Sequence, residues 1–234
     1  MAFLYATTAS GNVGVGNNAL KGNTIARFNV ACGQNSLFNN TTGEDNTCIG
    51  TNCGYSNTTG ARNTTLGRET LYTNTTGTNN VAIGYQALEH NTTAWNNVGT
   101  GYRSLNDATS GGSNAGYGGS TLSSLTTGTM NIAMGYLAGA YITTGTNNTC
   151  LGQAAGYANS PSGSITTGDN NVVLGNNSVA NLYCADTSIS SSDSRDKTDV
   201  TSFTIGLNWI EALRPVTYRW DRRTWYGTEE EPYG

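Results

Sequence analysis

The sequence predicts an all-β protein: a parallel β-solenoid, or β-roll, of about ten 17-residue coils, followed by a short α+β piece. Residues 13–188 divide into ten similar units, nine of 17 residues and one of 23 residues. The chain contains 31 glycines but only three prolines, a composition typical of regular structure with many tight turns. No helical periodicity is visible, and a unit is too short for a helix and a strand. Each unit is therefore expected to form one coil of two short strands and two turns.

Two columns of identical residues support this arrangement. The last position is asparagine in nine units, and stacking at the strand spacing would join amides such as those of Asn80, Asn97 and Asn148 into a hydrogen-bonded ladder. The fourth position of every unit is glycine, which indicates a positive φ angle or a backbone contact too close for a Cβ atom. The glycines of this column are Gly16, Gly33, Gly50, Gly67, Gly84, Gly101, Gly118, Gly135, Gly152 and Gly175.

The apolar residues predict the interior of the coil. The first and third positions are mostly apolar, which favours a short strand with these positions on its buried face. The eighth position is usually leucine and is expected to form a second inward row. The five cysteines include no CxxC pair, so we expect buried free thiols rather than zinc ligands or disulfides.

A coil of this length encloses little interior, and this favours an oligomer. At about 4.8 Å per coil, the repeats would form a rod about 48 Å long with a thin core. Stacking of the coils would stabilise the rod, and packing of several chains side by side would add apolar contacts. The expected assembly is a homotrimer.

The stretch TTGTNNVAIGYQAL, residues 75–88, resembles the head repeats of trimeric autotransporter adhesins of the YadA type. It also resembles similar repeats in tailed-phage fibres. The resemblance covers residues 13–188 and implies a left-handed parallel β-roll with three chains around one axis. The repeat of those adhesins is usually shorter than the repeat of this chain.

The composition changes where the repeats end. Residues 192–234 hold 14 of the 26 acidic and basic residues and three of the four tryptophans. An amphipathic pattern predicts a short helix over residues 205–213, and alternation predicts a strand over residues 216–220. The chain therefore divides into a lead-in (residues 1–12), the repeats (residues 13–188) and a C-terminal segment (residues 189–234).

The C-terminal segment contains SDSRDKTDV, residues 192–200, and GLNWIEALRPVTYRWD, residues 206–221. It resembles the start of the intramolecular chaperone of endosialidase-type phage tail spikes. The resemblance implies a domain that assembles the trimer and releases itself by a single-turnover cleavage between Ser191 and Ser192. Ser192 would be the nucleophile and Lys197 its base, which requires a lysine pKa lowered by burial. A solvated loop with ordinary charges is the alternative interpretation of these residues.

Aromatic side chains on a rigid scaffold are natural contacts for sugars or receptors. The fifth position of three units, directly after the glycine, is tyrosine, and a tryptophan and an insertion interrupt the regular turns elsewhere. Packing between neighbouring chains is the alternative role for these residues. The candidates for contact with a host-cell glycan or protein are Tyr85, Trp95, Tyr102, Tyr136 and Pro161.

Composition and charge argue against several other functions. The net charge of -4 offers no basic surface for nucleic acid. No apolar run approaches the about 20 residues of a membrane-spanning helix, and no signal peptide is evident. The single histidine, His90, has no companion at ligand spacing, so neither a metal nor another cofactor is expected. Residues 13–188 contain only seven acidic residues, which is unfavourable for the paired carboxylates of a glycosidase.

The sequence therefore predicts a structural viral protein, the trimeric tail fibre of a phage, which presents a rigid rod for attachment to a host cell. Its partners would be further copies of itself, a host-surface glycan or protein, and other tail proteins of the virion. Apart from self-cleavage before Ser192, no enzymatic activity is expected. Two alternatives remain open: a bacterial adhesin of the trimeric autotransporter type, and a fibre-borne enzyme that degrades glycans.

Overall fold

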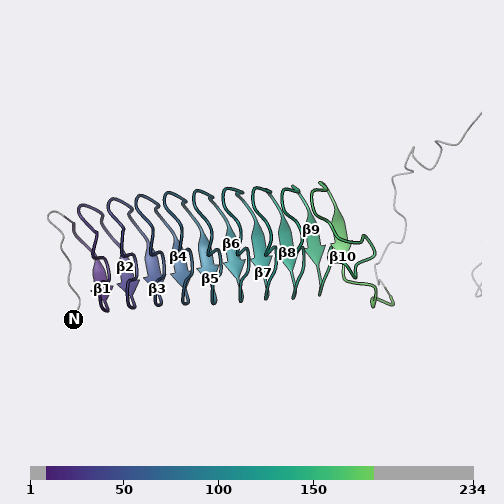
Figure 1. The fold of residues 1–234 in the computed structure, drawn as a ribbon, viewed down its shortest axis with the longest axis horizontal. Helices are drawn as coiled ribbons and strands as arrows, with labels where there is room; N and C mark the ends of the chain where they lie inside the picture. Colours follow the sequence, from purple (N-terminus) through teal and green to yellow (C-terminus); the bar gives the residue numbers. More distant parts are fainter. Residues whose placement is uncertain (1–8, 182–234) are drawn as a thin grey trace, which may run out of the picture. The chain divides into compact units, whose positions relative to one another are not determined.

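The computed structural model of the chain describes residues 9–181 as a parallel β-solenoid with one short strand in every coil (Figure 1). These residues contain no helix, so the all-β solenoid predicted from the repeats is confirmed. The strands are β1 (Val13–Val15), β2 (Val30–Cys32), β3 (Thr47–Ile49), β4 (Thr64–Leu66), β5 (Val81–Ile83), β6 (Val98–Thr100), β7 (Ala115–Tyr117), β8 (Ile132–Met134), β9 (Thr149–Leu151) and β10 (Val172–Leu174). We number each coil after its strand.

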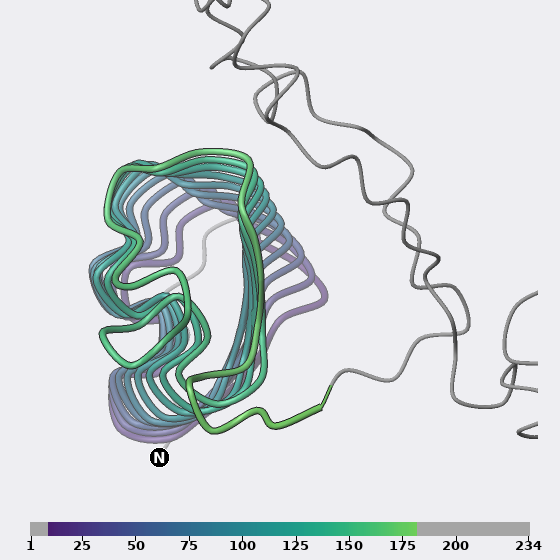
Figure 2. The same ribbon diagram turned by 90° about the vertical axis from the view of Figure 1, so that its right-hand side faces the viewer.

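All strands pair in parallel with their sequence neighbours and form one sheet in the order β1 to β10. The register is offset by one repeat, so that Val81 of β5 pairs with Val98 of β6 and Ala82 pairs with Gly99. Viewed along the solenoid, successive coils lie over one another with a gradual drift (Figure 2). Equal positions of the repeat therefore form columns along the solenoid.

Each coil contains one strand where the sequence predicts two. In coil 6 (residues 98–114), the φ angles of Gly101, Arg103 and Leu105 are 133°, 50° and 54°. A positive φ angle at every second residue is incompatible with an extended strand, so the segment after the strand forms a series of bends. These bends are still bonded between coils, since the Arg103 N–H donates to the Tyr85 carbonyl at 2.9 Å.

The strand residues point the opposite way from the sequence prediction. From β2 to β10 the second residue of the strand is buried inside the coil, as is Ala82, whereas the first and third residues, such as Val81 and Ile83, point outward. The width of the coil explains this arrangement. From β2 to β9 the second residue is alanine, cysteine, threonine or glycine, because the narrow interior holds only small side chains there. The larger apolar residues of the strands, at the first and third positions, lie on the outer face.

The glycine column marks a close backbone contact between coils. Gly84 has a φ angle of 121°, and a Cβ atom on this residue would lie 2.6 Å from the carbonyl oxygen of Gly101 in the next coil. Such contacts recur from Gly16 to Gly135, each with the glycine of the following coil. A side chain in this column would therefore push two coils apart.

In coils 1 to 9 the eighth position is leucine or glycine, and its φ angle is positive. Leu88 has a φ angle of 53° and is fully buried. Where glycine replaces leucine, another side chain fills the space: a Cβ atom on Gly54 would lie 3.0 Å from Cys48 Sγ, and one on Gly156 would lie 2.9 Å from Cys150 Sγ. These cysteines therefore act as small core residues that compensate for absent leucines.

The cysteine prediction holds for three of the four described cysteines. Cys48, Cys53 and Cys150 are buried free thiols, and burial raises the pKa of Cys150 to about 11. Cys32 is exposed, contrary to the prediction, because it is the third residue of β2 and lies on the outer face. Cys184 lies outside the described residues.

The asparagines at the last position form a buried ladder. The Asn97 backbone N–H donates to Asn80 Oδ1 at 3.0 Å. Asn114 donates both its backbone N–H (2.9 Å) and its side-chain Nδ2 (3.1 Å) to Asn97 Oδ1. The pattern continues to Asn148, whose Nδ2 donates to Asn131 Oδ1 at 3.0 Å. The ladder satisfies the buried amides and ties each coil to the one before it.

A second asparagine ladder, which the sequence analysis missed, occupies the eleventh position of the first coils. Asn57 Nδ2 donates to Asn40 Oδ1 at 2.8 Å, and Asn74 Nδ2 donates to Asn57 Oδ1 at 2.7 Å. In coils 6 to 9 the equivalent position is apolar and buried. It is occupied by Ala108, Leu125, Ile142 and Ile165.

Two predicted elements, the helix over residues 205–213 and the strand over residues 216–220, lie outside the described residues, as does the end of the last predicted coil. Within residues 9–181, no helix has the length and hydrophobicity needed to cross a membrane.

Candidate functional site

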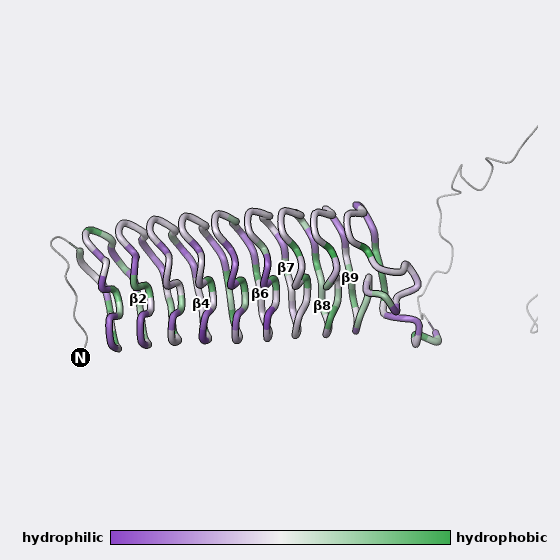
Figure 3. The backbone as a smooth tube through the Cα atoms, viewed as in Figure 1, coloured by the Kyte–Doolittle hydropathy of each residue, from purple (hydrophilic) through white to green (hydrophobic). Residues whose placement is uncertain are grey.

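The outer face of the ten-stranded sheet is uncharged and mostly apolar, with threonine at four of its positions. No acidic or basic residue occupies the first or third position of any strand. In-register pairing aligns these side chains in rows, and hydrophobic segments recur from coil to coil (Figure 3). We call this surface the apolar sheet face; its exposed large members are Val13, Val15, Ile49, Leu66, Ile83, Tyr117, Ile132, Met134, Leu151, Val172 and Leu174.

Tyr85 and Tyr102, two of the predicted receptor contacts, are brought together by the stacking of coils. Their rings lie with centroids 5.8 Å apart and an interplanar angle of 12°. The guanidinium of Arg68 lies over the Tyr85 ring at 5.8 Å, which extends the stack by one coil. Arg68 also contacts Glu69 at 2.8 Å, and this hydrogen bond lowers the pKa of the Glu69 carboxyl.

The remaining receptor candidates are exposed but separate. Tyr136 is 57% exposed, and Gly119 separates it from the Tyr102 ring in the column. Trp95 is 51% exposed and packs over Gly112, where a Cβ atom would lie 3.0 Å from the indole ring. Pro161 is exposed in the insertion of coil 9. The structure therefore shows one paired site, at Tyr85 and Tyr102, and three isolated ones.

A groove of about 290 Å³ crosses coils 6 to 9. It is lined by side chains at the fifth, sixth, ninth and tenth positions of the repeat, which point outward beyond the glycine column. Coil 6 contributes one wall, coil 7 the floor, and coils 8 and 9 the opposite wall. The lining residues are Tyr102, Arg103, Asn106, Asp107, Ser120, Ser123, Ser124, Leu137, Ala140, Tyr141 and Tyr157.

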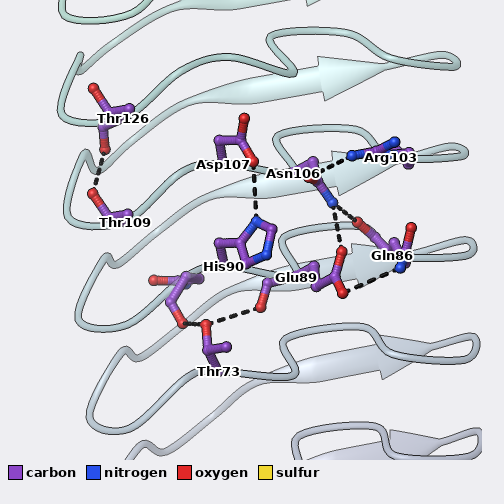
Figure 4. Close-up of polar contacts among 10 residues, drawn as sticks. Thr73, Gln86, Glu89, His90, Arg103, Asn106, Asp107, Thr109 and Thr126 are labelled. Atoms are coloured by element: carbon purple, nitrogen blue, oxygen red, sulfur yellow. Dashed lines mark hydrogen bonds and ion pairs between the residues drawn. The ribbon is translucent and has the colours of Figure 1, made fainter.

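The wall of the groove on coil 6 belongs to a polar network that extends over coil 5 (Figure 4). Arg103 Nη2 donates to Asn106 Oδ1 at 3.2 Å, and Asn106 Nδ2 donates to Glu89 Oε2 at 3.0 Å. Asp107 Oδ1 and His90 Nδ1 lie 3.0 Å apart in the same region. These bonds hold the side chains of this wall in place and leave the outer edge of the wall exposed to solvent.

Ser192 and Lys197, the proposed nucleophile and base, lie outside the described residues, as does the predicted cleavage position after Ser191. Their roles stay a prediction from sequence.

Residues 192–233 match a protein family described as the chaperone of endosialidase. This match supports the sequence-based interpretation of the C-terminal segment, and it begins at Ser192. No curated protein and no solved structure matches the chain. The resemblance of the repeats to adhesin heads and phage fibres therefore stays a prediction.

Sequence reasoning missed most of the groove. Of the predicted receptor contacts, only Tyr102 lines it. The missed signal lies in the ninth and tenth positions, where coil 7 has two serines while coils 8 and 9 have Tyr141 and Tyr157. A comparison of side-chain size down each column, rather than along each unit, would have indicated a hollow at coil 7.

Proposed function

We propose that the chain is a structural fibre protein of a tailed phage, in which three solenoids pack through the apolar sheet face and present their outer surface to the host cell. The observation that carries this proposal is the uncharged row of large apolar side chains on the outside of the sheet. Ile83 at its centre is 36% exposed and Leu66 beside it is 49% exposed. Contiguous apolar surface of this kind is typical of contact between protein chains.

The proposed number of three chains rests on the C-terminal segment. Its match to the endosialidase chaperone family supports assembly as a trimer, and a chaperone at the end of the chain would hold three solenoids in register. Parallel in-register strands form slowly, and the solenoid has unpaired strand edges at both ends. A C-terminal domain that holds three chains together would therefore assist folding and assembly.

The same segment is proposed to release itself after assembly. The Ser192 hydroxyl oxygen would attack the carbonyl carbon of Ser191, and the C–N bond between the two residues would break as an ester forms and the Ser192 nitrogen takes up a proton to become an amine. Water would then hydrolyse the ester, which gives a carboxylate on Ser191 and restores the Ser192 hydroxyl. Lys197 would accept the hydroxyl proton, which requires that burial in the assembled domain lowers its pKa. The family match supports this proposal because it starts at the residue after the proposed cut.

The assembly surface is tested by adding a charge to it. Ile83→Glu places a carboxylate at the centre of the apolar sheet face, and we expect light scattering to show single chains instead of trimers. Thr76→Glu is the matched control, since Thr76 is exposed in a turn away from the strands and its change should leave the trimer intact. A trimer that persists in Ile83→Glu would show that the chains meet elsewhere.

Self-cleavage is tested in the full chain. The wild type should be cut before Ser192, and both Ser192→Ala and Lys197→Ala should remain uncut in denaturing gels and intact mass spectra. Cleavage that continues unchanged in both variants would contradict the proposed chemistry while leaving the assembly proposal in place.

A further inference from the structure

We propose that the groove on coils 6–9 binds a segment of oligosaccharide. This inference rests on the proposed attachment function and assigns it to one site with one class of ligand. The volume of about 290 Å³ lies at the lower end of the range for small-molecule sites, about 300–1,000 Å³. The groove therefore suits a short stretch of a longer surface glycan whose remaining units extend into solvent.

The groove exists because coil 7 has small side chains at the ninth and tenth positions, both of which are larger in coil 6 and the second of which is larger in coil 8. Ser123 and Ser124 form the floor, at the ninth and tenth positions. The same two positions are occupied by Asn106 and Asp107 in coil 6, and Tyr141 occupies the tenth position in coil 8. The hollow is thus a local departure from the repeat, with a hydroxyl-lined floor between two taller walls.

One wall is a pair of stacked tyrosines. The ring centroids of Tyr141 and Tyr157 lie 4.3 Å apart, and the Tyr141 hydroxyl donates to the Tyr157 hydroxyl at 2.9 Å. Tyr141 is nevertheless 40% exposed, so the pair offers ring surface to a ligand. An aromatic face carries negative charge density, which attracts the weakly positive C–H hydrogens on the flat side of a sugar ring.

The opposite wall supplies a third ring and a pair of polar groups. Tyr102 is held by its stack on Tyr85, so its ring loses little freedom when a ligand binds. The Arg103 guanidinium uses one nitrogen on Asn106 and has further N–H donors, while Asp107 accepts at Oδ1 and has a second carboxylate oxygen (Figure 4). A donor and an acceptor on the same wall suit the hydroxyls of a sugar.

Other ligand classes fit this lining less well. A nucleic acid needs several cations along its backbone, and the lining of the groove has one arginine and also an aspartate. A purely apolar ligand would dehydrate the floor serines without replacing their hydrogen bonds. A sugar ring has an apolar face for the tyrosines and hydroxyls for the serines, Arg103 and Asp107.

The test applies the labelled full chain to an array of oligosaccharides from bacterial O-antigens and capsules. The wild type should bind one group of related glycans. Ser124→Tyr fills the groove with a side chain that the tenth position already holds in coil 8, and it should weaken binding by about tenfold or more. The matched control is Ser56→Tyr, the same change at the tenth position of coil 3, which should bind like the wild type.

A second pair of variants removes ring surface instead of adding bulk. Tyr141→Ala should weaken glycan binding, whereas Tyr136→Ala, another exposed tyrosine that does not line the groove, should not. Circular dichroism and light scattering of all variants should match the wild type. Absence of glycan binding by the wild type, or equal binding by Ser124→Tyr and Ser56→Tyr, would overturn the proposal.

Adsorption to bacterial cells separates this inference from the proposed attachment function. If the chain adsorbs to cells and Ser124→Tyr adsorbs equally well, the groove is not the attachment site although attachment stands. If array binding is lost in Ser124→Tyr while the wild type adsorbs to no cell type that carries the bound glycan, the groove is a glycan site and the attachment function is wrong.

Discussion

Coils 1–5 and coils 6–9 follow the same backbone path but fill one corner of the coil in different ways. At the eleventh position the first group has asparagine, whose Nδ2 donates to a carbonyl three residues later, as from Asn40 to Gly43 at 2.9 Å. The second group has apolar residues there, and Leu125 and Ile142 are fully buried. The coil therefore tolerates two kinds of interior as long as its glycine and terminal asparagine columns continue.

The junction between the two regions shows how they differ in physical terms. Asn74 Oδ1 is a buried side-chain oxygen that has no hydrogen-bond partner among residues 9–181, because the ladder stops there. In the next coil, the Asn91 oxygen accepts the Ala94 N–H at 2.9 Å instead. At this corner of the coil, directional amide bonds join the first coils, whereas burial of apolar surface stabilises the later coils.

The largest expected effect comes from placing an amide in the apolar region. Leu125→Asn removes a buried leucine and inserts an amide between Ala108 and Ile142, neither of which can pair with it. We expect the free energy of unfolding to fall by about 3–4 kcal/mol, measured by urea denaturation. Leu125→Ala removes the same packing without adding an amide and should cost about 2–3 kcal/mol. An equal loss in both variants would show that the amide itself is tolerated.

The reverse change should cost less. Asn57→Leu breaks the second ladder: the Asn40 oxygen loses its partner and the Asn74 amide keeps only its bond to the Gly77 carbonyl, but burial of the leucine side chain offsets part of this loss. We expect a decrease of about 2 kcal/mol in the free energy of unfolding. Asn39→Leu, at a partly exposed position of the same coil as Asn40, should change it by less than about 0.5 kcal/mol. A more stable Asn57→Leu variant would refute the structural role of the ladder.

The smallest expected effect concerns two buried thiols, that of Cys48 in the first group of coils and that of Cys150 in the second group. Because burial raises the pKa of Cys150 to about 11, its thiol stays protonated as the pH rises until it approaches that value. The pKa of Cys48 is also raised, first through its hydrogen bond with Cys53 and then through burial. Iodoacetamide at about pH 8 should leave both unmodified in the folded protein and react with both in urea, as peptide mapping would show. Rapid reaction of either thiol in the folded state would mean that the coil around it opens.

The columns of the repeat were predictable from sequence, because a parallel solenoid converts sequence period directly into spatial alignment. The glycine at the fourth position and the asparagine at the last position repeat without interruption over most of the chain. The direction of the strand residues was not predictable from alternation alone. An alternating pattern gives two faces, and only the narrow interior, which holds small residues such as Ala82, decides which face points inward.

The candidate sites were less predictable than the fold. Tyr102 stood out as an exposed aromatic residue, but the groove beside it depends on Ser123 and Ser124, which are unremarkable within their own unit. The second ladder was missed because its column changes from asparagine to leucine or isoleucine midway, which hides it from a search for identical residues. Positions that vary along a column require three-dimensional stacking before their neighbours are known.

We propose that three chains assemble through the apolar sheet face. Native mass spectrometry of the 234-residue chain measures the number of chains directly. We predict particles of three chains, and particles of three shortened chains where cleavage has occurred. A spectrum of single chains at micromolar concentration would contradict the account, since the exposed apolar rows would then have no partner of their own kind.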